Sequence, residues 1–202
     1  MRSVLLFTIV SCTVGVSSLL SACGGEPEGR AVAGRNIEVH TNLPVVVDSA
    51  FFKGTDGKTK VITPSASNRQ LVVLKPTIVN RTSTVIPLLV DTEAANIGDR
   101  RSRRFPAVDP ILKARSIDSE IEETPKVIDI SPVLWGEVEL PRKTQVEGYI
   151  VFDVPKGVIL GTLFWDEIEY IPVDFIDYWN CLLYTSDAAD EGLGVDLGGR
   201  RI

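Results

Sequence analysis

The densest charge on the chain is a run of arginines. Arg100, Arg101, Arg103 and Arg104 stand within five consecutive residues, next to Asp99. A guanidinium group offers its N–H donors as a planar fork, which fits the two oxygens of a phosphate or carboxylate. We therefore expect these four side chains to contact an anionic group on a polymer, a lipid or a partner protein. The alternative is a solvated hairpin loop whose charge is offset by acidic residues elsewhere.

The sequence gives little support for a metal site or a catalytic site. His40 is the only histidine, so a site built from several histidines is excluded, and no Gly-x-Ser-x-Gly nucleophile motif is present. Four acidic residues stand close together, and their carboxylates could bind Ca²⁺: Asp118, Glu120, Glu122 and Glu123. The EF-hand spacing fails there because Glu123 occupies the position that requires glycine. We expect a solvated acidic face, with no metal, no cofactor and no catalytic residue.

Two alternatives stay open at this point. One is a carbohydrate-binding surface lined by aromatic rings: Trp135, Trp165, Tyr170, Tyr178 and Trp179. Core packing is the stronger expectation for Trp165, because it lies in an apolar strand. The other is a hydrolase that uses a pair of carboxylates, since glycoside hydrolysis needs two acidic side chains and the chain has 27. No pair is singled out by its position.

The N-terminus has the features of an export signal. Arg2 precedes an apolar run from Val4 to Leu20, which is short for a helix that must span roughly 30 Å of hydrocarbon. The run ends in Leu20-Ser21-Ala22-Cys23, which resembles the lipobox of bacterial lipoproteins. The resemblance implies that residues 1–22 are a cleaved signal peptide and that Cys23 becomes a lipidated N-terminus. A plain secretory signal and an uncleaved anchor helix are the alternatives.

Two further segments are expected to lie outside the folded domain. Residues 23–36 are rich in Gly and polar residues, which predicts a flexible tether after the lipidated cysteine. Residues 181–202 resemble translated sequencing adapter: 181–190 match the transposase adapter and 195–202 match the flow-cell adapter, in order and in frame. We therefore interpret 181–202 as an artefact, and its charges and Cys181 support no functional argument.

Composition narrows the class of protein. Of 202 residues, 44% are hydrophobic and 24% charged, which is ordinary for a globular domain and excludes wholesale disorder. The net charge of −6 argues against a nucleic-acid partner. Cys12 leaves with the signal peptide and Cys181 lies in the artefact, so no disulfide is expected.

Short β-branched and aromatic segments alternate with turn residues along the domain. They are expected at 45–47, 60–63, 71–74, 85–90, 148–154 and 158–165. Alternation within 149–154 places Ile150, Phe152 and Val154 on a buried face and Asp153 on the other. Asp109-Pro110 predicts the start of one short helix. The pattern is all-β, an antiparallel β-sandwich with one short helix in a connection.

The segments 71–80, 83–91 and 148–157 together resemble a family of immunoglobulin-like ectodomains of unknown function that is frequent in bacterial lipoproteins. The resemblance implies an immunoglobulin-like β-sandwich over 37–180 and carries no catalytic residue across. The leading hypothesis is a non-enzymatic binding domain in the bacterial cell envelope, anchored to a membrane through Cys23 and facing the extracytoplasmic side. Its partner would be an envelope polymer or protein. The hydrolase above and a carrier of a small ligand or ion are the alternatives.

Overall fold

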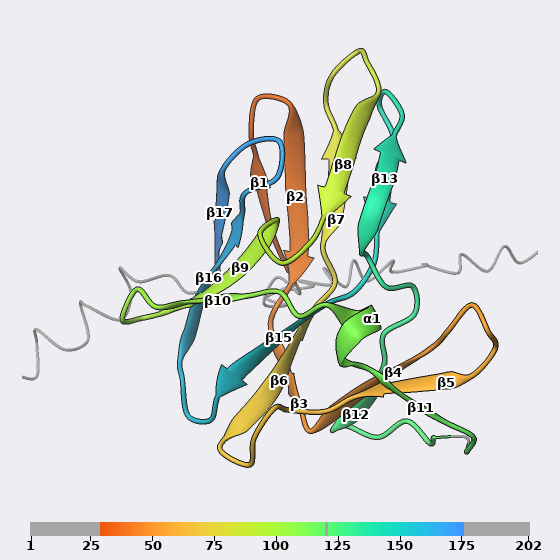
Figure 1. Ribbon diagram of the computed structural model, residues 1–202. Coiled ribbons are helices and arrows are strands. Elements are labelled where there is room, and N and C mark those ends of the chain that lie inside the picture. The colour runs from red at the N-terminus through yellow and green to blue at the C-terminus, as the bar shows by residue number, and fades with distance from the viewer. Residues whose placement is uncertain (1–28, 120, 176–202) are drawn as a thin grey trace, which may run out of the picture.

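The computed structural model describes residues 29–119 and 121–175, and almost all of their regular structure is β-strand (Figure 1). The predictions for residues 1–22, Cys23 and 181–202 concern parts of the chain outside these ranges. Within these ranges, no helix is long and apolar enough to cross a membrane.

The six strands expected from the sequence are all present. They are β3 (Val45–Val47), β5 (Thr59–Ile62), β6 (Arg69–Leu74), β8 (Ile86–Val90), β15 (Ile150–Pro155) and β16 (Leu160–Trp165). The predicted helix is confirmed as α1 (Pro110–Lys113), the one helix of the described residues. The Asp109 side chain caps it by accepting hydrogen bonds from the backbone N–H groups of Ile111 and Leu112, at 2.8 and 3.0 Å.

Three sheets, together with strands β6 and β15, surround the larger hydrophobic core. The first has the order β1 (Gly29–Ala33), β2 (Ile37–Asn42), β7 (Thr77–Asn80), β14 (Gln145–Glu147). The second has the order β10 (Arg104–Pro106), β9 (Ala95–Asp99), β16, β17 (Ile171–Asp174), and β8 pairs with β13 (Gly136–Leu140) in the third. Val39 and Ile78 of the first sheet, Leu163 and Trp165 of the second and Leu88 of the third are among the residues that this core buries.

The tether is shorter than the sequence indicates. Residues 29–33, expected to be flexible, form β1 and pair antiparallel with β2 in the register Gly29↔Asn42 to Ala33↔Glu38. The prediction was wrong there because it relied on apolar periodicity. β1 is instead held mainly by its backbone ladder and lies beside β17, so it needs few buried side chains.

A second layer lies below these sheets in Figure 1. It has the order β11 (Arg115–Ile117), β5, β4 (Ser49–Lys53), β12 (Val127–Asp129), and β12 pairs with β4 in parallel, unlike the other strand pairs described. A smaller apolar cluster packs it against the sheet β15, β6, β3. The cluster includes Phe52, Ile62, Leu71, Val73 and Val151.

The central strands β6 and β15 are therefore buried on both faces. Ile150, Phe152 and Val154 face the larger core, as predicted. Val151, however, is 2% exposed and belongs to the smaller cluster, so the opposite face of β15 is covered by protein and not by solvent. The fold is mostly β, with several antiparallel sheets and one short helix.

Candidate anion-binding site

The arginine run forms the turn of a β-hairpin between β9 and β10. β9 lies inside its sheet, between β10 and β16, which fixes the base of the hairpin. The turn is closed by the backbone N–H of Asp99 donating to the carbonyl of Arg103 at 2.9 Å. Ser102 adopts a positive φ of 62°, which the reversal of the chain requires. This geometry is compatible both with a solvated hairpin loop and with a loop that contacts an anion.

Asp99 organises the turn. Its side chain is only 3% exposed, and its Oδ1 accepts from the backbone N–H groups of Arg101 and Arg103 at 2.8 and 2.9 Å. Its Oδ2 accepts from Nε of Arg103 at 2.7 Å and forms an ion pair with Nη2 at 2.6 Å. Burial opposes ionisation, but these hydrogen bonds and the Arg103 charge outweigh it, so the pKa of Asp99 lies below its ordinary value. An acidic residue just before a turn is a local signal that could have revealed this role.

Three of the four arginines share one hollow. Arg100, Arg101 and Arg103 line a cavity of about 190 Å³ with Asp99 and residues 157–159. The backbone N–H of Arg100 donates to the carbonyl of Ile159 at 3.2 Å, which holds the hairpin against the connection between β15 and β16. Three arginines and one aspartate are therefore among the residues that line the hollow. This arrangement can bind an anion of phosphate or carboxylate size.

Arg104 lies apart, on an aromatic stack. Its guanidinium carbon is 3.7 Å from the centre of the Phe164 ring and 5.7 Å from that of Tyr170, whose hydroxyl accepts from Nη2 at 3.3 Å. Gly98 lies opposite Arg104 in the ladder, and a Cβ there would be 2.6 Å from the Phe164 ring, so glycine makes room for the stack. Arg104 also forms an ion pair with Asp166 at 3.9 Å. The structure therefore does not place Arg104 in the hollow with the other three.

The histidine and the acidic run remain solvated. His40 lies on β2 with its ring nitrogen 2.7 Å from the Glu38 carboxylate, and its side chain is half exposed. Asp118 is 92% exposed and pairs with Lys58 at 3.5 Å, while Glu120 lies outside the described residues. Among the residues that the structure describes, no three His, Cys, Asp or Glu side chains come together as metal ligands would.

The aromatic residues are dispersed. Trp165 is fully buried, as expected, and its indole N–H donates to the carbonyl of Glu167 at 2.9 Å. Trp135 packs partly buried against the larger core, and Tyr170 belongs to the Arg104 stack. Residues 176–180, which include Tyr178 and Trp179, lie outside the described ranges. The described rings do not form one shared surface.

One surface hollow does gather acidic side chains. Glu137, Glu139 and Glu167 line a cavity of about 380 Å³ beside Pro87, Leu88 and Leu89. Glu167 already accepts a hydrogen bond from the backbone N–H of Leu89 at 3.1 Å. The two-carboxylate hydrolase stays an untested prediction, and the sequence did not single out these three residues.

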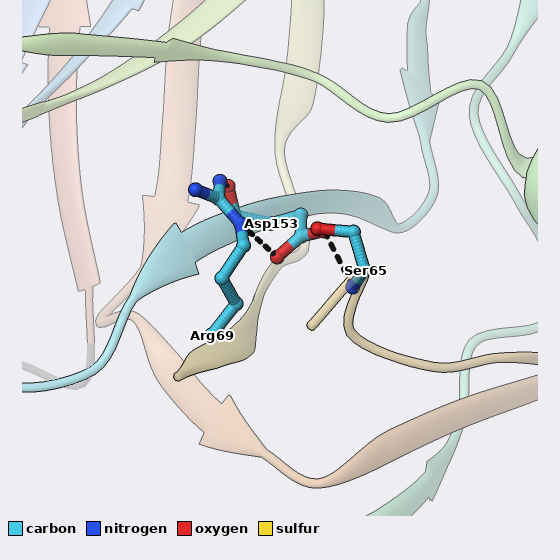
Figure 2. Close-up of polar contacts among 3 residues, drawn as sticks. All are labelled: Ser65, Arg69 and Asp153. Carbon is cyan, nitrogen blue, oxygen red and sulfur yellow. Dashed lines mark hydrogen bonds and ion pairs between the residues drawn. The ribbon is translucent and has the colours of Figure 1, made fainter. Parts of the chain in front are cut away.

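A partly buried ion pair joins residues distant in the sequence. Figure 2 shows Asp153 of β15 between Arg69 and Ser65: its Oδ1 accepts from Nε of Arg69 and its Oδ2 from the backbone N–H of Ser65, both at 2.9 Å. Burial opposes ionisation of Asp153, but the bonds from Ser65 and Arg69 outweigh it and lower its pKa. The pair fastens the connection between β5 and β6 to β15. The separation of 84 residues left no local signal for it.

The sequence also did not indicate the role of Glu169. Its carboxylate accepts from the backbone N–H groups of Arg35, Asn36 and Ile37 at 3.0, 2.7 and 2.8 Å. These bonds connect the turn between β1 and β2 to the turn between β16 and β17. Burial opposes ionisation, but the three backbone donors and the Arg35 charge outweigh it, so the pKa of Glu169 is lowered.

Comparison with known proteins gives one match, to a solved structure. No family model matches the chain, and no curated protein matches it. The matching structure is described as "a putative lipoprotein (ycdA)" from Bacillus subtilis subsp. subtilis str. 168, with a TM-score of 0.43 and 16% sequence identity. The match covers 80% of this chain and 42% of that one, so the chain spans less than half the length of the protein it resembles.

Proposed function

We propose that the chain is a bacterial lipoprotein whose domain binds an anionic group in the cell envelope and catalyses no reaction. Lipid on Cys23 would hold the domain at a membrane on its extracytoplasmic side. The lipobox-like Leu20-Ser21-Ala22-Cys23 after an apolar run supports the anchor. One acyl chain holds a protein only marginally, at about 0.8 kcal/mol per buried CH₂, whereas two or more give stable anchoring.

We further propose that the domain is an immunoglobulin-like β-sandwich. The strands β6, β7, β8 and β15 lie on the segments that carried the resemblance to the immunoglobulin-like family. The sheet that contains β2 and β7 and the sheet that contains β9 and β16 both contribute to the larger core. Sandwiches of this kind present loops at their ends, and binding residues are commonly found on such loops.

The observation that carries the binding function is the hollow beside Asp99. There, a nearly buried carboxylate holds two backbone N–H groups and one guanidinium in place, which gives the turn a defined backbone. Asp99 forms an ion pair with Arg103, and Arg100 and Arg101 line the same hollow, so the excess of positive residues there supports anion binding. We propose phosphate groups of an envelope polymer as the ligand.

The test removes these two charges from the full-length protein. Arg100→Ser with Arg101→Ser should weaken binding to inorganic polyphosphate about a hundredfold or more, because two charge-assisted contacts of about 1.5 kcal/mol or more each are lost. Arg115→Ser with Arg142→Ser is the matched control, since it removes two exposed arginines outside the hollow. Equal affinity in both double variants would contradict the proposal. Binding to an acidic peptide but not to polyphosphate would replace the polymer with a protein partner.

A further inference from the structure

The structured domain begins close to the expected lipid. Residues 24–28 alone separate Cys23 from Gly29, the first residue of β1. Six residue steps span at most about 20 Å even when the chain is fully extended. Because Gly29 pairs with Asn42, a lipid on Cys23 would also bring the end of β2 within this reach of the membrane. The shortened tether therefore limits which part of the surface can face the bilayer.

Exposed apolar side chains lie at this end of β2. Leu43, Val45 and Val46 are 40%, 40% and 48% exposed, although each is a large hydrophobic residue. They directly follow Asn42, the partner of Gly29, and a Cβ at Gly29 would lie 3.5 Å from the Asn42 Cα. The apolar residues and the chain that leads to Cys23 thus emerge at the same place.

This apolar segment is held in a fixed position. The Asn42 side chain accepts from the backbone N–H of Lys75 at 2.6 Å and donates to the carbonyl of Leu43 at 2.8 Å. Val45 and Val46 then pair with Val73 and Val72 of β6. β3 is the outer strand of its sheet, so its far side has no neighbouring strand among the described residues. The segment, which we call the β3 edge (Leu43, Val45 and Val46), is thus exposed and attached to β6.

We propose that the β3 edge rests on the membrane interface beside the lipid anchor, as a second, non-covalent contact with the bilayer. The proposal rests on the lipid anchoring of Cys23 proposed above. Exposed apolar groups gain free energy when they leave water for the boundary between headgroups and acyl chains. A protein partner would instead have to enter the space of about 20 Å that the tether leaves above the bilayer.

A polar hollow flanks the β3 edge at headgroup level. It has a cavity volume of about 370 Å³, and Arg30, His40 and Lys75 are among its lining residues. Lys75 is paired with Glu147 at 2.5 Å, which offsets the attraction of Lys75 for anionic lipid. The contact should therefore depend on the apolar side chains more than on the lipid charge.

The test measures the depth of one label on the full-length lipidated protein in vesicles. Val46→Cys is labelled with the environment-sensitive fluorophore NBD, in a Cys181→Ser background, and the protein is reconstituted into phosphatidylcholine vesicles with and without doxyl-labelled lipid. Val85→Cys is the matched control, because Val85 has a similar exposure of 55%. Val85 follows Thr84, whose carbonyl accepts a hydrogen bond from the Asn80 side chain. Asn80 pairs with Ile37, which lies about 17 Å along β2 from Asn42, at the opposite end of that strand from the β3 edge.

We expect a blue-shifted emission and quenching by doxyl lipid at position 46, with neither at position 85. Adding anionic phosphatidylglycerol should change this contrast little. A label at position 46 that stays as exposed to water as the control, on protein that floats with the vesicles, would overturn the inference and leave the anchor standing. A blue shift without doxyl quenching would also overturn it and indicate a protein neighbour, such as a second copy. Protein that fails to float would overturn the anchor and the inference together.

Discussion

Individual polar side chains fix the loops of this molecule by satisfying several backbone groups at once. Asn80 at the end of β7 is 1% exposed, and its Nδ2 lies 2.8, 3.0 and 3.1 Å from the carbonyl oxygens of Thr84, Leu140 and Pro141. Its Oδ1 accepts from the backbone N–H and the hydroxyl of Thr82. Asp99 does the same for the arginine hairpin. Such residues explain why the turns that they contact have a definite shape.

Asn80→Asp should destabilise the protein by about 3 kcal/mol, because the new oxygen would face three carbonyls and a buried charge would have no counterion. Urea unfolding of the full-length protein measures the loss. Asn68→Asp makes the same chemical change at an exposed position and should alter the free energy of unfolding by less than about 0.5 kcal/mol. Similar losses in the two variants would argue against the role assigned to Asn80.

For the strands, the sequence predicts their positions in the chain better than it predicts which of their faces are buried. The segments 71–74 and 148–154 were identified because they are short, rich in β-branched or aromatic residues and bounded by turn residues, and the structure confirms strands there as β6 and β15. Alternation could not reveal that the second face of β15 is covered, since that depends on a layer built from β4, β5, β11 and β12, which are separate segments of the chain. β1 was missed because a strand held by its backbone ladder has no apolar pattern.

Glu169 joins the β1–β2 hairpin to the β16–β17 hairpin, so replacing it should weaken the attachment of one hairpin to the other. Its pKa is lower in the folded protein than in the unfolded chain, so its contribution is complete at neutral pH and is lost as the pH falls from the ordinary value of 4.5 toward the folded one. Glu169→Gln should therefore cost about 1–2 kcal/mol at neutral pH and progressively less in acid.

Urea unfolding as a function of pH tests this prediction, with Glu139→Gln as a control at an exposed position. A cost for Glu169→Gln that stays constant from neutral pH to well below 4.5 would contradict the link between β1 and the turn that holds Glu169.

For the whole molecule, the arginine hollow and the β3 edge suggest a domain with two different contacts, one for an anionic polymer and one for the bilayer. The sequence identified the four arginines by type and spacing. It could not show that Asp99 and Arg103 neutralise each other, or that Arg104 lies on Phe164, because these depend on how β9, β10 and β16 pair. Trp165 lies in the core, as its apolar strand predicted, but the sequence could not show that Tyr170 packs beside Arg104.

Lipidation of Cys23 is the central claim, because the location of the domain at a membrane and the proposed contact of the β3 edge with the bilayer both follow from it. The most direct measurement is incorporation of radiolabelled palmitate into the full-length protein expressed in a bacterial host. We predict labelled protein in the membrane fraction, and loss of both the label and the membrane association in Cys23→Ala. Labelling that persists in Cys23→Ala, or wild-type protein that carries no label, would contradict the account.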